Sequence, residues 1–271
     1  MIVSAYLNYK ELTIKKKIQF ILETKLDGLS FKEEDLKDLE AYKNAKIQIL
    51  NCELNCQSYL ATDKAAHQMY LEKLGNISKS LKDYNIKTIT TTIPKVNLSQ
   101  ELELLNEIII DYYNILKKNK VQLVLATSTD YKANEFAYIL KNNKKVKAFS
   151  FDCDKFYRNN HAVLPSFKIL KEYIKILKVS DRKENIPVLI GYGNYKLIEI
   201  FKTLIKDNKQ ILIEMNTNLL ELEKKPTIQA FFSKKIKKQN SIYRDLEAKI
   251  GEITLEKILI NQAEAVLKIL K

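Results

Sequence analysis

Two carboxylates are candidates for proton transfer or metal binding because of their positions in the sequence. Asp152 and Glu214 each end a short, mainly apolar run that has the length of a buried strand. A carboxylate in such a place costs free energy unless it is paired, hydrogen-bonded or bound to a metal. Two of them together can transfer protons or hold a divalent cation. Neighbouring amides or lysines could equally fix them in a purely structural role, so both interpretations stay open.

Cysteine and histidine give no disulfide or zinc motif. The sequence has 3 cysteines (Cys52, Cys56 and Cys153) and 2 histidines (His67 and His161). An odd number of cysteines gives no disulfide framework, and neither histidine is placed to complete a zinc site with Cys52 and Cys56. We therefore expect reduced and mostly buried thiols.

The chain is strongly basic. Its 46 Lys and Arg residues outnumber 33 Asp and Glu residues, which gives a formal net charge of +13. Such a balance could neutralise nucleic-acid phosphates, but the lysines are spread over almost every segment, as on solvated helix faces. The densest runs are at 15–17 and 233–238. No run has the length of a membrane span and the N-terminus reads as a strand, so we expect a cytoplasmic protein with no membrane partner.

Strand-like and helix-like patterns alternate along the chain. The predicted strands are Ile2–Leu7, Leu26–Phe31, Ile47–Leu54, Lys87–Ile93, Val121–Ala126, Val146–Phe151, Ile174–Val179 and Gln210–Glu214. The predicted helices are Leu12–Thr24, Glu33–Asn44, His67–Tyr84, Ser99–Lys118 with Ser99 as its cap, Asn134–Lys141, Pro165–Tyr173 and Tyr195–Lys206.

Eight strand–helix units predict a parallel sheet that is covered on both faces. We interpret the chain as a single α/β domain over residues 1–271, a closed (β/α)8 barrel. An open, doubly wound sheet is the alternative. Residues 217–271 should provide the last helix and a C-terminal extension, with Pro226–Phe232, a basic stretch and a helix over Ile253–Leu270.

Several strand ends carry recognisable segments. Leu26-Asp-Gly-Leu-Ser-Phe31 opens the series, and Leu177-Lys-Val-Ser-Asp181, Pro187-Val-Leu-Ile-Gly-Tyr-Gly-Asn-Tyr195 and Leu212-Ile-Glu-Met215 follow in the second half. In order and spacing they resemble the xylose isomerase-like TIM barrels, the sugar isomerases and epimerases related to endonuclease IV. The resemblance covers roughly residues 1–216.

The resemblance implies a divalent-metal site (Mn, Zn, Co or Mg) at the C-terminal mouth of the barrel. The family binds one metal through a glutamate, an aspartate, a histidine and a glutamate that follow strands five to eight. These positions fall on Ala126, Asp152, Lys178 and Glu214. Asp152 and Glu214 are the retained ligand positions. Since alanine and lysine cannot ligate the ion, the expected site is degenerate and the preferred expectation is no bound metal.

Lys178 suggests how such a site could be neutralised. We expect its ammonium to occupy the former metal position and to pair with Asp152 and Glu214. These three residues are the catalytic candidates, with the carboxylates as acid and base.

The resemblance also places the glycine-containing loop beside the substrate, where Lys196 and Arg182 could hold a phosphate. Alternatively, the glycines only serve a tight turn. Tyr157, Arg158 and His161 should lie in a mobile loop over the mouth. The candidate substrate-binding residues are Lys155, Asp181, Arg182, Gly191, Gly193 and Lys196.

Three functions remain open. The first is a sugar or sugar-phosphate isomerase or epimerase-like protein with a degenerate metal site. The second is a non-catalytic ligand-binding or interaction barrel of the same family. The third is a nucleic-acid-binding relative of endonuclease IV.

Overall fold

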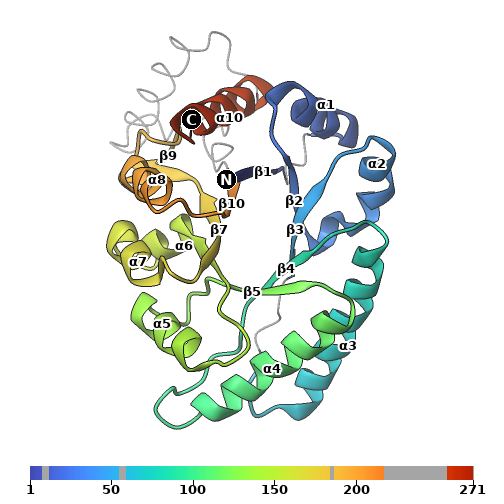
Figure 1. Cartoon of the computed structure of the whole chain (residues 1–271), viewed down its shortest axis with the longest axis vertical. Helices are drawn as coiled ribbons and strands as arrows, with labels where there is room; N and C mark the ends of the chain where they lie inside the picture. Colours follow the sequence, from blue (N-terminus) through green and yellow to red (C-terminus); the bar gives the residue numbers. More distant parts are fainter. Residues whose placement is uncertain (8–11, 55–58, 184–185, 217–254, 271) are drawn as a thin grey trace, which may run out of the picture.

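The computed structural model describes residues 1–7, 12–54, 59–183, 186–216 and 255–270. Eight parallel strands close into a barrel in the order β1-β10-β7-β6-β5-β4-β3-β2 (Figure 1). This confirms the (β/α)8 barrel, and the open doubly wound sheet is wrong. The strands are β1 (Ile2–Tyr6), β2 (Gly28–Lys32), β3 (Ile49–Leu54), β4 (Thr88–Thr91), β5 (Gln122–Ala126), β6 (Phe149–Asp152), β7 (Ile174–Val179) and β10 (Leu212–Asn216).

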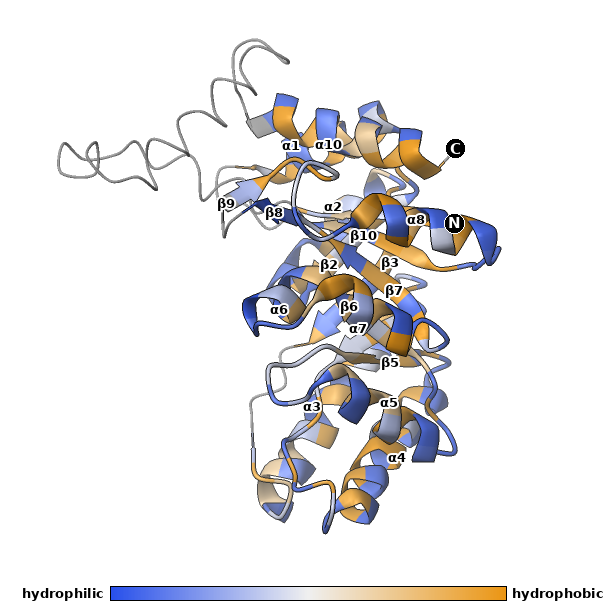
Figure 2. Ribbon diagram, turned by 90° about the vertical axis from the view of Figure 1, so that its left-hand side faces the viewer, coloured by the Kyte–Doolittle hydropathy of each residue, from blue (hydrophilic) through white to orange (hydrophobic). Residues whose placement is uncertain are grey.

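Helices surround the barrel, and α10 packs beside α1 where the ends of the ring meet (Figures 1 and 2). No described helix is both long enough and apolar enough to cross a membrane. The helices are α1 (Ile14–Thr24), η1 (Glu33–Asp38), α2 (Leu39–Asn44), α3 (Lys64–Lys82), α4 (Leu102–Lys118), α5 (Ala133–Asn142), α6 (Cys153–Arg158), α7 (Val163–Leu170), α8 (Leu197–Lys206) and α10 (Leu255–Leu270).

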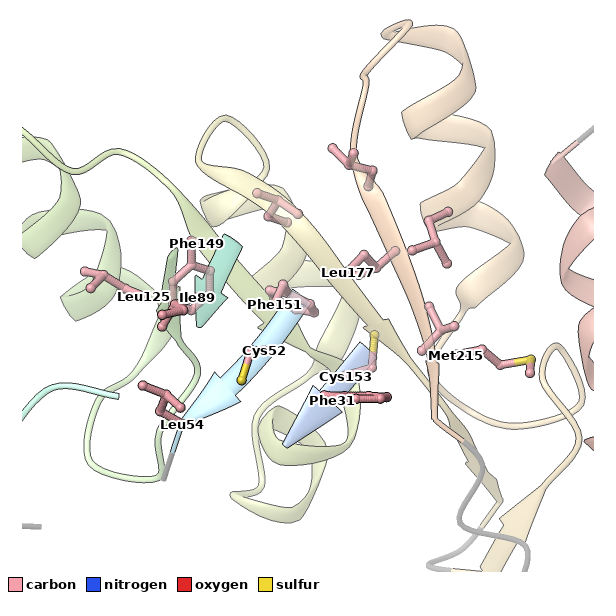
Figure 3. Close-up of a cluster of buried hydrophobic side chains, with 14 of the residues drawn as sticks. Phe31, Cys52, Leu54, Ile89, Leu125, Phe149, Phe151, Cys153, Leu177 and Met215 are labelled. Atoms are coloured by element: carbon pink, nitrogen blue, oxygen red, sulfur yellow. The ribbon is translucent and has the colours of Figure 1, made fainter. Parts of the chain in front are cut away.

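Side chains alternate between the two faces of each strand, which separates an apolar layer from a polar interior. The strand residues that face the helices form one hydrophobic cluster (Figure 3), which includes Phe31, Cys52, Leu54, Ile89, Leu125, Phe149, Phe151, Leu177 and Met215. Residues one position away, such as Ser30, Asn51, Thr90 and Ser150, are buried inside the barrel. Because helix packing needs only one face, the other face is free to carry polar groups.

The barrel interior changes character along its axis. Val124, Ala148 and Ile176, with Leu212 against them, form a small apolar cluster towards the N-terminal ends of the strands. Glu214 lies two residues beyond Leu212, and polar side chains fill the interior from that level towards the mouth. The apolar layer separates this polar interior from the N-terminal end, and barrels of this kind keep their active sites at the C-terminal end.

The segment after β6 is helical, which corrects the expected mobile loop over the mouth. Asp152 Oδ1 accepts hydrogen bonds from the backbone nitrogens of Asp154 and Lys155, both at 3.0 Å. This N-cap nucleates α6, which contains Tyr157 and ends at Arg158. His161 lies in the short connection that follows.

Two further details differ from expectation. Ser99 does not cap α4, which begins after Glu101; instead Asn97 Oδ1 accepts from the Ser99 nitrogen at 3.2 Å. A small antiparallel hairpin of β8 (Asp181–Lys183) and β9 (Ile186–Val188) stands before α8 and was not predicted. The predicted C-terminal helix is present as α10, while Pro226–Phe232 and the basic run at 233–238 lie outside the described residues.

The two cysteines in the described part of the chain are buried, as predicted. Burial raises the pKa of Cys52 to about 12 and also raises the pKa of Cys153. Both thiols therefore stay protonated and pack as small apolar groups. Cys56 lies outside the described residues.

Replacing Gly75 on α3 with alanine should raise the free energy of unfolding by up to about 1 kcal/mol, because alanine loses less entropy in a helix. The added Cβ would meet Ile115 Cγ2 at 3.7 Å, an ordinary contact. Urea unfolding of both proteins measures the difference. A loss of stability would mean that α3 and α4 pack too tightly here to accept a methyl group.

Candidate active site at the barrel mouth

A buried lysine joins two glutamates inside the barrel mouth. The strand register places Lys178 opposite Asp152 on one side and opposite Glu214 on the other. The Lys178 ammonium donates a hydrogen bond to Glu53 Oε2 and lies 3.3 Å from Glu214 Oε1. Glu53 comes from β3, which is not adjacent to β7, so the three side chains meet across the interior.

The predicted ion pair of Lys178 is therefore half correct. Glu214 is a partner, as expected, but Glu53 takes the place that was assigned to Asp152. The reason is that the Asp152 carboxylate turns to the N-terminus of α6, where it accepts two backbone hydrogen bonds. Its negative charge still acts on Lys178 from the neighbouring strand.

A chain of hydrogen bonds fixes the second oxygen of Glu214. Asn51 Nδ2 donates to Glu214 Oε2 at 3.2 Å, and Thr90 Oγ1 donates to Asn51 Oδ1 at 2.8 Å. Asn51 and Thr90 are fully buried, and Glu214 is 2% exposed. Both carboxylate oxygens of Glu214 are thus engaged, which compensates the cost of burying the charge.

Electrostatics keep Lys178 and Glu53 ionised at neutral pH. Burial alone would lower the pKa of Lys178, but the carboxylates of Glu214, Glu53 and Asp152 outweigh burial and raise it. Burial raises the pKa of Glu53, but the ammonium groups of Lys178 and Lys155 outweigh this and lower it to about 2. Lys178 thus acts as a permanent cation and cannot serve as a general base.

Lys155 links the cluster to the rim of the mouth. Its ammonium donates to the Thr127 carbonyl at 3.2 Å and lies 3.7 Å from Glu53 Oε1. The side chain is 37% exposed, whereas that of Lys178 is 6% exposed. Of these two cations, Lys155 is the one that a ligand at the mouth can reach.

Asp181 holds the glycine-containing loop. Its carboxylate accepts hydrogen bonds from the backbone nitrogens of Arg182 (3.0 Å), Gly191 (3.0 Å), Gly193 (2.8 Å) and Tyr195 (3.3 Å). Burial nevertheless outweighs these four bonds and raises the pKa of Asp181. Gly191 has a φ of 91°, which favours glycine. The tight-turn interpretation of this loop therefore has a direct structural basis.

Arg182 belongs to a separate buried network. Its Nε donates to Asp154 Oδ1 at 2.6 Å, and the Tyr195 hydroxyl donates to the same oxygen at 2.7 Å. Arg158 Nε lies 2.7 Å from Asp154 Oδ2. Lys196 is exposed at the start of α8 and stands apart from this network, 3.9 Å from Glu199 Oε1.

The structure thus divides the predicted residues into three groups. Lys178 and Glu214 converge with Glu53, Lys155 stands beside them, and Asp152 caps α6. Asp181, Arg182, Gly191 and Gly193 build the hairpin and loop after β7. Substrate binding by these four residues, by Lys155 and by Lys196 stays a prediction.

Asn51 and Thr90 are site residues that the sequence did not predict, and Glu53 was placed at the end of a strand without a role. Asn51 and Glu53 alternate with apolar residues in β3, a signal that the inward face of this strand is polar. Nothing in the linear order shows that β3 faces β7 and β10 across the barrel.

A pocket of about 470 Å³ opens at the mouth beside this cluster. It lies where β4 and β5 end, and Lys155 is part of its lining. Asp152, Lys178 and Glu214 do not line it. The other lining residues are Tyr59, Leu60, Thr92, Ile93, Pro94, Lys95, Ser128, Thr129 and Asp130.

Solved structures share this architecture over the whole chain. D-Psicose 3-epimerase from Clostridium cellulolyticum H10, solved with D-tagatose, superposes with a TM-score of 0.69 at 14% identity, covering 100% of this chain and 98% of the epimerase. The IolI protein with a bound zinc atom superposes with a TM-score of 0.71 at 12% identity, covering 100% of this chain and 98% of the IolI chain. A xylose isomerase-like TIM barrel protein from Mycobacterium smegmatis in complex with magnesium superposes with a TM-score of 0.67 at 9% identity. The match covers 99% of this chain and 96% of that protein.

The chain has the xylose isomerase-like TIM-barrel fold. No family model matches the sequence, and no curated protein matches it. At such low identity the likeness is one of fold, so the chemistry of this xylose isomerase-like barrel has to be argued from its own residues.

The mouth of this xylose isomerase-like barrel does not suit a divalent cation, although zinc or magnesium is bound in two of the structures above. The Lys178 ammonium already lies between Glu53 and Glu214, where it would repel a second cation. Asp152 Oδ1 already accepts hydrogen bonds from two backbone nitrogens. In the described part of the chain, no group of three or more His, Cys, Asp and Glu side chains could hold a metal.

Replacing Glu53 with glutamine should destabilise the barrel at pH 7 by up to about 3 kcal/mol, the stability that corresponds to a pKa lowered from 4.5 to about 2. A lowered pKa contributes stability that is complete above pH 4.5 and is lost as the pH falls towards 2. The gap between the parent and the variant should therefore close over this range. Urea unfolding at pH 7, 5 and 3 measures it, with the exposed Glu264→Gln as control; a gap that is independent of pH would contradict the prediction.

Proposed function

We propose that this chain is a member of the xylose isomerase-like family and acts on a sugar or sugar phosphate at the barrel mouth without a divalent metal. Its reaction would be the proton transfer of an isomerase or epimerase. The observation that carries this proposal is the Lys178 ammonium, which is fixed between Glu53 and Glu214 at the end of the barrel where such folds keep their sites.

The fixed cation supports a metal-independent site in two ways. It neutralises part of the negative charge of Glu53, Glu214 and Asp152, so the interior is stable without another cation. It also makes the local potential less negative, so that the partly exposed Lys155 ammonium at the rim can attract an anionic ligand or a developing enolate oxygen. Because Lys178 keeps its proton, a base must come from a carboxylate such as Asp152 or Glu214, or from another group at the mouth.

A second candidate is a barrel of the same family that binds its ligand without chemistry. The burial of the central cluster favours it, since Lys178 is 5% and Glu214 2% exposed and both are fully paired with protein groups. Such a cluster would support the walls of a binding site without touching the ligand.

Metal content and thermal unfolding test the metal-independent site. We expect the purified chain to hold no stoichiometric metal, and its melting temperature to be unchanged by Mn, Co, Zn or Mg ions or by a chelator. One tightly bound metal per chain would overturn this part of the proposal.

Catalysis is tested with chelator-treated protein and a panel of ketoses, aldoses and their phosphates, followed by product analysis. Conversion of one sugar into its isomer or epimer supports the enzyme. Sugar binding without conversion supports the second candidate, and neither binding nor conversion would contradict both.

A further inference from the structure

The pocket beside the central cluster has the size and lining of a small-molecule site. Its volume of about 470 Å³ lies within the usual range for ligand pockets. Two cations (Lys95 and Lys155) and one carboxylate (Asp130) give the lining a net positive charge. Hydroxyl groups from Tyr59, Thr92, Ser128 and Thr129 complete it. This chemistry suits a polyol that carries an anionic group.

One lining residue ends a chain of hydrogen bonds that can move a proton. The hydroxyl of Tyr59 lies 2.9 Å from His67 Nδ1, and His67 Nε2 lies 3.0 Å from Asp111 Oδ2. The Tyr112 hydroxyl lies 2.5 Å from the Tyr59 hydroxyl. Hydroxyl, imidazole and carboxylate thus stand in the order that activates a nucleophile or a base in other enzymes.

The direction of these hydrogen bonds follows from the carboxylate. Asp111 can only accept, so His67 Nε2 carries a proton and a neutral imidazole leaves Nδ1 as an acceptor. Tyr59 then donates its proton to Nδ1, while Tyr112 donates to the Tyr59 oxygen. The hydrogen bond from Tyr112 favours the phenolate form of Tyr59, and His67 Nδ1 is placed to accept the proton that leaves. The nearby Asp111 stabilises the imidazolium that forms when the proton moves.

The surrounding packing holds this relay in place. The His67 ring stacks on Tyr112 at 5.9 Å between centroids, and Tyr70 packs against Tyr112 at 5.1 Å. The Tyr70 hydroxyl is hydrogen-bonded to Thr91 at the end of β4. The cluster therefore connects α3 and α4, which lie side by side (Figure 1), to the strand end that borders the pocket. Nothing in the Lys178 cluster takes part in it.

We propose that this pocket is the reaction site, that it takes a sugar bearing an anionic group, and that Tyr59, activated by His67 and Asp111, is its proton-transfer residue. The proposal rests on the proposed function for the class of ligand. Lys155 is the electrophilic partner, since its partly exposed ammonium lies in the same lining.

The step balances without any co-reactant. Tyr59 gives its proton to His67 Nδ1, and the phenolate oxygen takes the proton from the carbon next to the sugar carbonyl. The electron pair of the broken C–H bond moves into an enediolate, whose oxygen the Lys155 ammonium stabilises. Tyr59 then gives the proton to the former carbonyl carbon, the hydroxyl proton of the enediolate passes to its other oxygen, and His67 returns its proton to Tyr59. This gives the isomer and restores both residues.

Deuterium incorporation tests the relay directly. The full chain is incubated in D2O with fructose 6-phosphate or other ketose phosphates, and exchange at carbons next to the carbonyl is followed by proton NMR. Tyr59→Phe should lower the exchange rate at least about 100-fold while binding of the sugar phosphate, measured by calorimetry, changes less than threefold. Asp111→Asn should lower the exchange rate tenfold or more, because an amide can reverse the imidazole tautomer.

Matched variants separate chemistry from binding. Lys155→Met should weaken binding and exchange together, whereas Lys168→Met and Tyr138→Phe, both at exposed positions, should leave both unchanged. Exchange that persists in Tyr59→Phe, or sugar-phosphate binding by the parent without any exchange, overturns the relay but leaves ligand binding at the mouth intact. A parent chain that neither binds nor exchanges any sugar would contradict the proposed function and the relay with it.

Discussion

Replacing Lys178 with methionine is expected to lower the free energy of unfolding by about 3–5 kcal/mol at pH 7, because it leaves two buried carboxylates without their cation. Glu53 and Glu214 would then face each other in the barrel interior. Protonation of one of the two carboxylates is the change that relieves their repulsion at the lowest cost in free energy. Methionine has nearly the same length and volume as lysine, so the loss reports the charge and not a cavity.

Urea unfolding at several pH values measures this loss. Since protonation of the carboxylates relieves the repulsion, the difference between the parent and Lys178→Met should shrink as the pH falls from 7 towards 4. The double variant Lys178→Met/Glu53→Gln should recover part of the stability, whereas the exposed Lys168→Met should lose none. A Lys178→Met protein that is as stable as its parent and binds sugars equally well would show that the ammonium does not replace a metal.

The sequence predicted the barrel because each strand has an apolar face that must be covered by helices. Periodicity along Ile174–Val179, for example, marked β7 with its correct bounds. Periodicity did not mark β8 and β9, because three-residue strands are too short for any period to stand out. The N-cap of α6 was also missed: Asp152 was interpreted as a strand-end ligand, although a carboxylate followed by free backbone nitrogens is equally a helix start.

The candidate site was only partly predictable for a geometric reason. Lys178 and Glu214 end neighbouring strands, so their proximity follows from strand order and register. Glu53 reaches Lys178 across the interior from β3, and Tyr59, His67 and Asp111 meet through the packing of α3 against α4. Such contacts depend on barrel diameter and helix packing, which a pattern along the chain does not encode.

A substitution in the loop after β7 is expected to have the second large effect on stability. Gly193→Ala is expected to lower the free energy of unfolding by about 3 kcal/mol, because the added Cβ would overlap the Asp181 carboxylate and stand 2.5 Å from the Arg182 carbonyl oxygen. Relief of this overlap would move Asp181 away from the backbone nitrogens that it holds, leaving them without acceptors in a partly buried loop.

Thermal and urea unfolding of Gly193→Ala measure the effect. Gly75→Ala is the matched control, because the same chemical change there makes only an ordinary van der Waals contact. If Asp181 only shapes this loop, Asp181→Asn should destabilise the chain yet bind sugar phosphates with unchanged affinity once folded. A binding loss of tenfold or more in a folded Asp181→Asn protein would instead return Asp181 to the ligand site that its position after β7 first suggested.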